Sequence, residues 1–295
     1  GMIDIGHSEF ALRLLEPGAD GDRLGSRYSH SGYIHQAWRG GRPLLGMPFE
    51  PFDVFHGEGF PDEFEQPIGY EAAAIGEGFV KIGVGVVEKN ADHPYTNHDR
   101  HRVVQPAEHA VRVDGRSVTF EQSLDFGVYG YRYRKSVAVG AGSSFRIAHR
   151  LTNSGSAGWQ SFWYSHVFLP RPRVGEPYHL ELPPCYRPDQ ANAARGAAGR
   201  YALPPAAEAC FWWAVPPDER DAHRVAGTAM SFACAGDYPV REFMVYQNPR
   251  VVSPEPRLSI ALQPGASIAW ASDYRFEEHS ELDPADGMEM EQTGS

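Results

Sequence analysis

The sequence is poor in cysteine, in long hydrophobic runs and in helical periodicity. Its three cysteines, Cys185, Cys210 and Cys234, form no CxxC pair, which argues against a disulfide framework and predicts a reducing compartment. No segment approaches the roughly 18 consecutive apolar residues of a spanning helix, so no membrane span is expected. The first residues show neither the basic nor the apolar part of a secretory signal, and we therefore expect a cytoplasmic protein.

A basic surplus is also absent. The net charge is −11, and seven acidic residues lie within 277–295, which contains no Lys or Arg. Nucleic acid and anionic membranes both attract clustered basic side chains, so neither is an expected partner. Because residues 277–295 include few core-forming side chains, they are predicted to be an acidic C-terminal tail outside the folded domain.

Apolar and polar residues alternate with a period of two over much of the chain, as in Val118, Phe120 and Leu124. Strong helix signals are lacking, and 31 Gly and 24 Pro interrupt short apolar runs. This pattern predicts an all-β fold, a large antiparallel sandwich or barrel, as a single domain over residues 1–276. Within the Pro-, Ala- and Gly-rich segment 170–217, the stretch "DQANAARGAAGRY" (189–201) is expected to be a long surface loop.

Two dipeptides predict tight turns. Asp114-Gly115 lies between strand-like runs and indicates a primed hairpin turn, in which both central residues have positive φ. Pro264-Gly265 has the residues of a type II turn, and alternation on both sides of it predicts another hairpin.

One histidine stands in an unusually apolar strand, "NSGSAGWQSFWYSHVFLP" (153–170). His166 is predicted to share a face with Phe162, Tyr164 and Phe168, whereas Trp163 lies on the other face. Both faces are mostly apolar, so the imidazole needs a partner. It is either a core histidine bonded to a carbonyl or to Tyr164, or a functional group in a lined cavity.

Three other stretches favour the functional reading. Residues 68–89, "IGYEAAAIGEGFVKIGVGVVEK", contain closely spaced glycines that allow close approach to the backbone, and they carry Glu77 and Lys81. Glu255 lies between two prolines, so its backbone is stiff and the carboxylate is expected at the rim of a strand. Arg27 precedes another strand-like stretch.

In the order of its segments and in their amino-acid sequences, the chain resembles the galactose mutarotase-like (aldose 1-epimerase) superfamily from about residue 20 to 276. The resemblance is carried by "SGYIHQAWRGGRPLLG", "GEGFVKIGV", "GYRYRKSVAV", "FRIAHRLTNSGSAGWQSFWYSHVFL" and "SPEP" followed by "LQPGASIAWASDYRF". The resemblance to uncharacterised bacterial members of the superfamily is stronger than the resemblance to the galactose mutarotases or to the hexose-6-phosphate epimerases. It implies a large antiparallel β-sandwich with a sugar cleft, which interconverts the anomers of an aldose without a metal or other cofactor.

The resemblance also implies roles for single residues. His166 corresponds to the acid histidine of the superfamily and Glu255 to its base glutamate. Glu77 replaces a second histidine, which puts catalysis in question, and Lys81 stands in for a following arginine. Arg27, Glu77, Lys81, Trp163 and Tyr164 are the candidate substrate-binding residues. The rings of Trp163 and Tyr164, with that of Trp159, could pack against a sugar.

Two alternatives remain open. His93, His98 and His101 in "DHPYTNHDRH" could bind a metal, although their spacing fits no standard zinc motif. The same fold could also bind carbohydrate without catalysis. The sequence leaves the identity of the sugar open; a basic cluster of Arg27, Lys81 and Arg257 would favour a phosphorylated one.

Overall fold

The computed structural model describes residues 1–171, 177–189, 196–205 and 207–279, and these are almost entirely β-structure. The strand pairs found among them are antiparallel. The single helical element of this part of the chain is a 3₁₀ turn, η1 (Gly21–Arg23), and no helix in it could cross a membrane. The predicted all-β antiparallel sandwich is confirmed.

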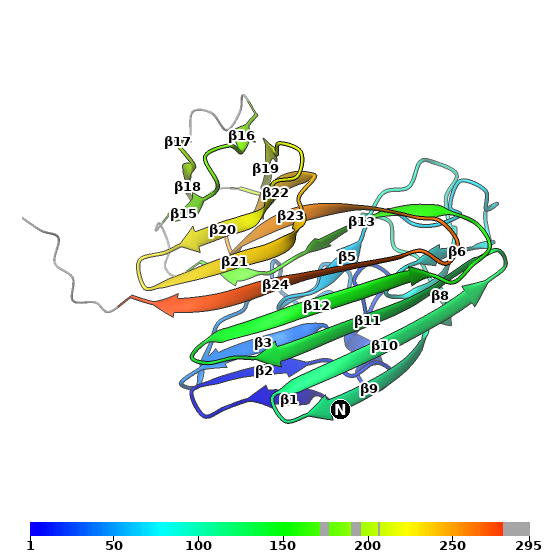
Figure 1. Ribbon diagram of the computed structural model, residues 1–295, viewed down its shortest axis with the longest axis horizontal. Coiled ribbons are helices and arrows are strands. Elements are labelled where there is room, and N and C mark those ends of the chain that lie inside the picture. Colours follow the sequence, from blue (N-terminus) through cyan, green and yellow to red (C-terminus); the bar gives the residue numbers. More distant parts are fainter. Residues whose placement is uncertain (172–176, 190–195, 206, 280–295) are drawn as a thin grey trace, which may run out of the picture.

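The larger sheet has ten strands within the described residues, in the order β17-β18-β15-β20-β21-β24-β12-β11-β10-β9. Its long strands form one layer of the molecule (Figure 1). The bounds are Gly196–Ala197 (β17), Arg200–Leu203 (β18), Tyr178–Glu181 (β15), Arg220–Ala226 (β20), Met230–Pro239 (β21), Ser267–Glu278 (β24), Ser144–Asn153 (β12), Tyr129–Val139 (β11), Ser117–Phe126 (β10) and Glu108–Asp114 (β9).

The second large sheet lies behind this layer in Figure 1 and has seven strands in the same described ranges. Its order is β16-β19-β22-β23-β13-β5, with β14 also pairing with β23. The bounds are Arg187–Pro188 (β16), Ala209–Ala214 (β19), Glu242–Gln247 (β22), Val251–Leu262 (β23), Trp159–Ser165 (β13), Asp62–Phe64 (β5) and Leu169–Pro170 (β14).

Two small sheets accompany the large ones. One contains Ile3–Gly6 (β1), Phe10–Leu14 (β2), Ile34–Arg39 (β3) and Arg42–Pro43 (β4). It packs against the ten-stranded sheet, since the ring of Phe10 stacks 6.0 Å from that of Phe145. The other contains Gly78–Lys81 (β6), Gly85–Glu88 (β7) and Val103–Pro106 (β8).

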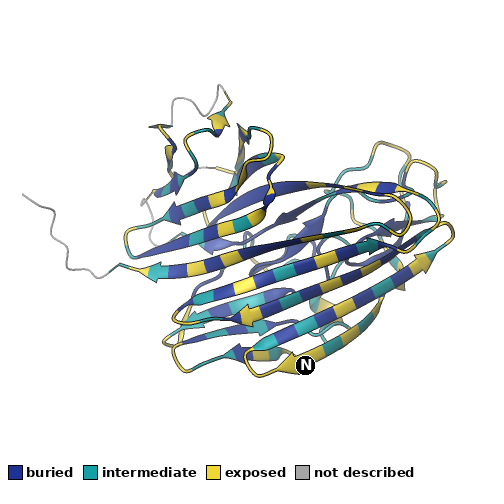
Figure 2. Cartoon of the chain, viewed as in Figure 1, coloured by how far each residue is buried: buried dark blue, intermediate teal, exposed yellow. Residues whose placement is uncertain are grey.

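The core lies between the two large sheets, where aromatic side chains meet. Trp163 of β13 contacts Trp270 of β24, with ring centroids 5.3 Å apart, and Phe64 of β5 lies edge-on to Tyr133 of β11 at 5.2 Å. The alternation predicted from the sequence is visible along β10, β11 and β12 in Figure 2. These three strands thus bury one face between the layers and expose the other, whereas β23 is buried on both faces from Val251 to Leu258.

The hairpin predicted at Asp114-Gly115 is present but has a different turn. The hairpin predicted at Pro264-Gly265 is wrong. Asp114 pairs with Ser117, and only Gly115 of the two residues between them has positive φ (58°), so the primed turn with two positive φ values is absent. At Pro264-Gly265 the type II turn is present: Gly265 has φ 78°, and the Ala266 N–H donates to the Gln263 carbonyl at 3.0 Å. The flanking strands, however, join opposite sheets.

The end of the loop predicted over 189–201 is wrong, because Gly196–Ala197 (β17) and the first residues of Arg200–Leu203 (β18) lie in it and extend the ten-stranded sheet. Composition hid these short strands, because Gly and Ala are depleted in strands and the pairing that forms these strands is not visible in the local sequence. Residues 190–195, within the expected loop, lie outside the described residues. Residues 280–295 of the expected acidic tail also lie outside the described residues. The first two residues of that tail, Glu277 and Glu278, are the last residues of β24.

Candidate functional site

The site is built around a local break in strand pairing. Strand β13 pairs with β23 up to Tyr164 opposite Arg257, and β14 resumes pairing at Leu169 opposite Val252. Between these points β23 reads Ser-Pro-Glu-Pro, and proline has no N–H to donate. The backbone of His166 leaves the ladder and donates instead to the Pro61 carbonyl at 2.8 Å, so its ring fills the break.

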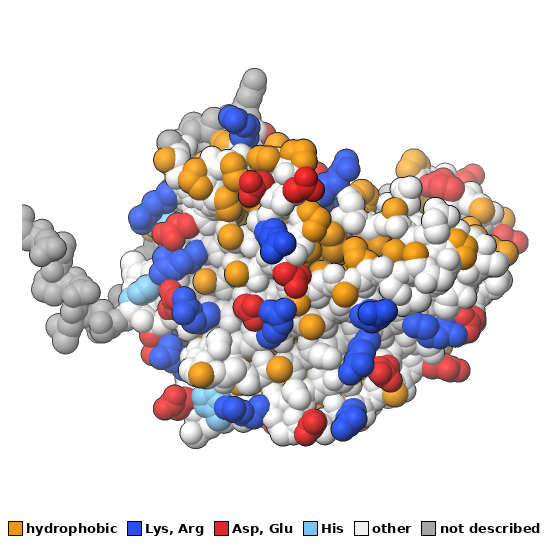
Figure 3. All heavy atoms as spheres, viewed as in Figure 1, with side chains coloured by type: hydrophobic (Ala, Val, Ile, Leu, Met, Phe, Trp, Pro, Cys, Tyr) orange, Lys and Arg blue, Asp and Glu red, His pale blue; other side chains and the backbone are white. Residues whose placement is uncertain are grey.

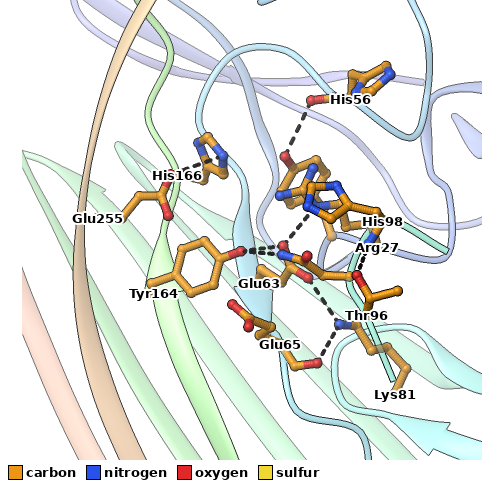
Figure 4. Close-up of polar contacts among 12 residues, drawn as sticks. Arg27, His56, Glu63, Glu65, Lys81, Thr96, His98, Tyr164, His166 and Glu255 are labelled. Carbon is orange, nitrogen blue, oxygen red and sulfur yellow. Dashed lines mark hydrogen bonds and ion pairs between the residues drawn. The ribbon is translucent and has the colours of Figure 1, made fainter. Parts of the chain in front are cut away.

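Both ring nitrogens of His166 face β23. Nδ1 lies 2.6 Å from Oγ of Ser253, and Nε2 lies 3.2 Å from Oε1 of Glu255. Ser253 and Glu255 are two residues apart and therefore point to the same side of the strand. The structure thus brings together the two residues predicted to be catalytic, although Glu255 lies in the middle of a strand and not at a rim (Figure 4).

Glu255 is buried and incompletely satisfied. Its side chain is 1% exposed, and neither carboxylate oxygen has a hydrogen-bond partner among the described residues, because the 3.2 Å contact with His166 lacks hydrogen-bond geometry. Burial raises the pKa of Glu255 well above its ordinary value, and the charges of Arg257 and Arg27 oppose this only in part. Burial likewise lowers the pKa of His166 well below its ordinary value, reinforced by Arg27.

A second buried carboxylate, Glu63 of β5, has a full set of partners. Its Oε2 accepts from Nε of Arg27 at 2.8 Å and from the Tyr164 hydroxyl at 2.5 Å, and its Oε1 accepts from Nζ of Lys81 at 3.1 Å. Burial alone would raise the pKa of Glu63, but the two cations and the hydroxyl lower it to about 2. Figure 4 shows this cluster beside the His166–Glu255 pair.

The His166–Glu255 pair lines a pocket of about 260 Å³ on the outer face of the seven-stranded sheet. Four predicted residues contribute to it: Arg27, Tyr164, His166 and Glu255. The other lining residues are Tyr28, Pro48, Phe49, His56, Glu65, Asn97, His98, Phe168, Glu208, Cys210, Trp212, Met244, Tyr246 and Arg257. The imidazole is therefore neither a sealed core group nor bonded to Tyr164; it borders a cavity.

Three of the predicted substrate-binding residues do not line this pocket. Lys81 is 1% exposed and lies beneath it, bonded to Glu63. Glu77 is exposed in the turn before β6, where Oε2 accepts from the Ala74 N–H at 2.9 Å. Trp163 faces the core, because it is one residue from Tyr164 and strand side chains alternate. Trp159 shares that inward face.

In the described structure the histidine-rich loop does not bring three potential metal ligands together. Of its histidines only His98 lines the pocket, whereas Nδ1 of His101 lies 3.0 Å from the Glu88 carbonyl and Nε2 of His93 lies 3.5 Å from Asp99. The one group of three potential ligands found in the described residues is Asp221, His223 and Cys234, buried in the core. There Asp221 accepts hydrogen bonds from the other two, at 2.8 Å and 3.0 Å.

Several residues of the site were not predicted from the sequence. Ser253 could have been found, because alternation places it on the same face as Glu255. Glu63 gave no local signal, since its partners come from three other parts of the chain. Tyr28, Phe168 and Tyr246, whose rings also line the pocket, were not predicted as site residues, because buried aromatic residues are common in any β core and the sequence does not show which of them border a cavity.

Comparison with known proteins supports the fold. Neither a family model nor a curated protein sequence matches the chain. Among solved structures, a proposed aldose 1-epimerase of Escherichia coli K12 is 15% identical with a TM-score of 0.64, covering 95% of this chain and 99% of that one. A galactose mutarotase-like protein of Lactobacillus casei is 13% identical with a TM-score of 0.62, covering 94% and 100%.

The GalM/aldose epimerase homologue of C. elegans is 11% identical with a TM-score of 0.56, and the match covers 95% of this chain and 99% of that one. The chain has the galactose mutarotase-like fold. At sequence identities this low, structural similarity establishes the fold alone. The resemblance seen in the sequence is thus confirmed for the fold. In this fold the His166–Glu255 pair lies on the outer face of the seven-stranded sheet.

Proposed function

We propose that this protein is an aldose 1-epimerase, which binds a sugar in the His166–Glu255 pocket and interconverts its anomers. The observation that carries the proposal is the contact between a buried imidazole and a buried carboxylate with free oxygens, at the floor of a pocket of about 260 Å³. A buried polar group without a partner costs stability, and a substrate hydroxyl would satisfy it.

The chemistry needs only proton transfers. Glu255 accepts the proton of the anomeric hydroxyl while His166 donates one to the ring oxygen, and the bond between C1 and that oxygen breaks to give the open-chain aldehyde. After rotation about C1–C2 the ring closes from the other face with the roles reversed. Both sugar oxygens are bonded to C1, so an acid and a base 3.2 Å apart can reach them together. Each positioned group contributes about 10²–10⁴-fold.

The charges around the pocket favour a sugar without a phosphate group. Arg27 and Lys81 share Glu63, while Arg257 pairs with Glu65 and, through Nε at 3.1 Å, with Glu242. Each cation of the expected basic cluster thus contacts a carboxylate, and Arg27 and Lys81 share the same one. The guanidinium groups of Arg27 and Arg257, which border the pocket, remain suited to binding sugar hydroxyls.

Polarimetry on freshly dissolved α-glucose and α-galactose tests the proposal. We expect the wild-type protein to accelerate the decay of optical rotation toward equilibrium, and His166→Gln to remove most of that acceleration. Metal content and circular dichroism of both proteins serve as controls for adventitious catalysis and misfolding. Wild-type protein that binds these sugars without accelerating the decay would contradict the assignment.

That last outcome is the second candidate function, a carbohydrate-binding protein without catalysis. It is favoured by one observation: burial and Arg27 both disfavour the imidazolium form of His166, which the acid step uses. Binding measured by calorimetry, unaltered in His166→Gln, would support this alternative.

A further inference from the structure

A second hollow adjoins the candidate pocket on the outer face of the seven-stranded sheet. Its volume is about 730 Å³, and Trp212 lines both hollows. We call the second hollow the Trp212 groove; it is lined by Arg187, Pro188, Asp189, Trp212, Trp213, Ala214, Val215, Pro217, Val240, Arg241 and Glu242. The first pocket, at about 260 Å³, lies below the roughly 300–1,000 Å³ typical of sites for larger ligands.

The two hollows lie next to each other along β19 and β22. Along β19, Cys210, Trp212 and Ala214 point to one side; Cys210 lines the pocket and Ala214 lines the groove. Along the neighbouring strand β22, Met244 lines the pocket and Glu242 lines the groove. A ligand can therefore extend along these two strands from one hollow into the other.

The position of Trp212 sets a length for such a ligand. Trp212 pairs with Met244, and Met244 pairs with Glu255 on the next strand. Since neighbouring strands lie about 4.8 Å apart, the backbones of Trp212 and Glu255 are about 10 Å apart. This is more than one pyranose ring spans when its anomeric carbon lies at Glu255, so one ring leaves the groove unfilled.

The groove has the chemistry of a neutral sugar site. Trp212 is 37% exposed. Figure 3 shows the opposite side of the molecule, the side of the ten-stranded sheet, where hydrophobic side chains gather at the end that contains β19 and β22. The groove is lined by charged side chains of both signs, Arg187 and Arg241 with Asp189 and Glu242, of which Glu242 also pairs with Arg257. No field of a single sign therefore selects an anionic or a cationic ligand. A flat apolar indole beside charged hydrogen-bonding groups fits a ring with an apolar face and hydroxyls at its edge.

We propose that the Trp212 groove binds the second sugar unit of a reducing disaccharide or longer oligosaccharide, whose reducing-end ring occupies the His166–Glu255 pocket. The inference rests on the proposed epimerase function and names its substrate class. Arg257 joins the two parts, since its guanidinium lies 5.6 Å from the Trp212 ring centroid and its Nε 3.1 Å from Oε1 of Glu242.

The test compares mutarotation of freshly dissolved glucose and galactose with that of maltose, lactose and cellobiose. We expect kcat/KM for at least one disaccharide to exceed that for the monosaccharides by about fivefold or more, the size of one aromatic contact. Acceleration of monosaccharides without any preference for a disaccharide would overturn the groove and keep the epimerase. Acceleration of no sugar would overturn the epimerase itself.

Variants then locate the preference. We expect Trp212→Ala to bring the disaccharide-to-monosaccharide ratio of kcat/KM close to one. Ala214→Arg, which fills the groove from an exposed position and removes no contact, should do the same if Trp212→Ala proves unstable. Trp38→Ala, at a partly buried tryptophan outside both hollows, should leave the ratio unchanged. A ratio that survives both groove variants would refute the proposal.

Discussion

Two buried carboxylates of the same sheet, Glu63 and Glu255, have opposite environments. Glu63 accepts from two cations and a hydroxyl, and its pKa falls to about 2. Glu255 has no hydrogen-bond partner within the described part of the chain, and burial raises its pKa well above the ordinary value. The first is bound as a fixed charge, whereas the second can exchange a proton.

This difference separates supporting residues from reacting ones. Glu63 holds the side chains of Arg27 and Tyr164 in place and balances the charge under the pocket. Glu255 and His166, by contrast, have environments that favour their neutral forms, so the pair readily shares a single proton. Proton exchange with a substrate needs this second kind of environment, because a fully bonded carboxylate is a poor base.

The largest expected effect comes from Glu255→Gln. We predict a loss of mutarotation rate of about 10²–10⁴-fold, because the amide cannot accept and return the anomeric proton. The free energy of unfolding at pH 7, measured by urea denaturation, should be no lower than that of the wild type, because the buried carboxylate loses no hydrogen bond. Strong destabilisation with retained activity would mean that Glu255 has a structural role.

Glu63→Gln should have the reverse profile. The change removes the counter-charge of buried Arg27 and Lys81, and breaking a buried ion pair costs about 3–5 kcal/mol. Urea denaturation should show this loss. Glu65→Gln is the matched control two residues away: its carboxylate is 30% exposed and its partner Arg257 also contacts Glu242, so about 1 kcal/mol or less is expected.

The stability difference between wild type and Glu63→Gln should depend on pH. The folded pKa of about 2 is below the ordinary 4.5, so the stabilisation by Glu63, about 3 kcal/mol, is present above pH 4.5 and is lost as the pH falls toward 2. Glu255→Gln should show no such loss on acidification, because the pKa of Glu255 is raised. A Glu63→Gln difference that is constant from pH 7 to 2 would contradict the ionised, ion-paired state.

The sequence predicted the strands better than their partners. Alternation locates β10 and β11 because each has one face in the core, and this periodicity is local. Near Pro264-Gly265 the same alternation was misleading, because a type II turn can join strands within one sheet or across a sandwich. Only pairing distant in sequence, β23 with β13 and β24 with β12, decides between them.

Like the fold, the site was predictable from the sequence only where the signal is local. The pairing of His166 with Glu255 came from the resemblance, and proline on both sides of Glu255 was a genuine local sign of interrupted pairing. Glu77 was misplaced because a turn's position relative to a pocket depends on the whole sandwich. Glu63 was missed because a buried carboxylate is recognisable only by its partners, here Arg27 and others far away in sequence.

The smallest expected effect concerns Ser253, which contacts the ring nitrogen of His166 remote from Glu255. The acid step needs protons on both nitrogens, so Nδ1–H donates to the Ser253 hydroxyl 2.6 Å away and stabilises the imidazolium. Ser253→Ala should lower kcat about 2–10-fold, the size of one hydrogen bond. It should also lower the pKa of His166 and shift the alkaline limb of the pH–rate profile to lower pH. Ser161→Ala, which removes another buried serine hydrogen bond, should leave that limb in place; an equal shift in both variants would leave Ser253 without a specific role in positioning the imidazole.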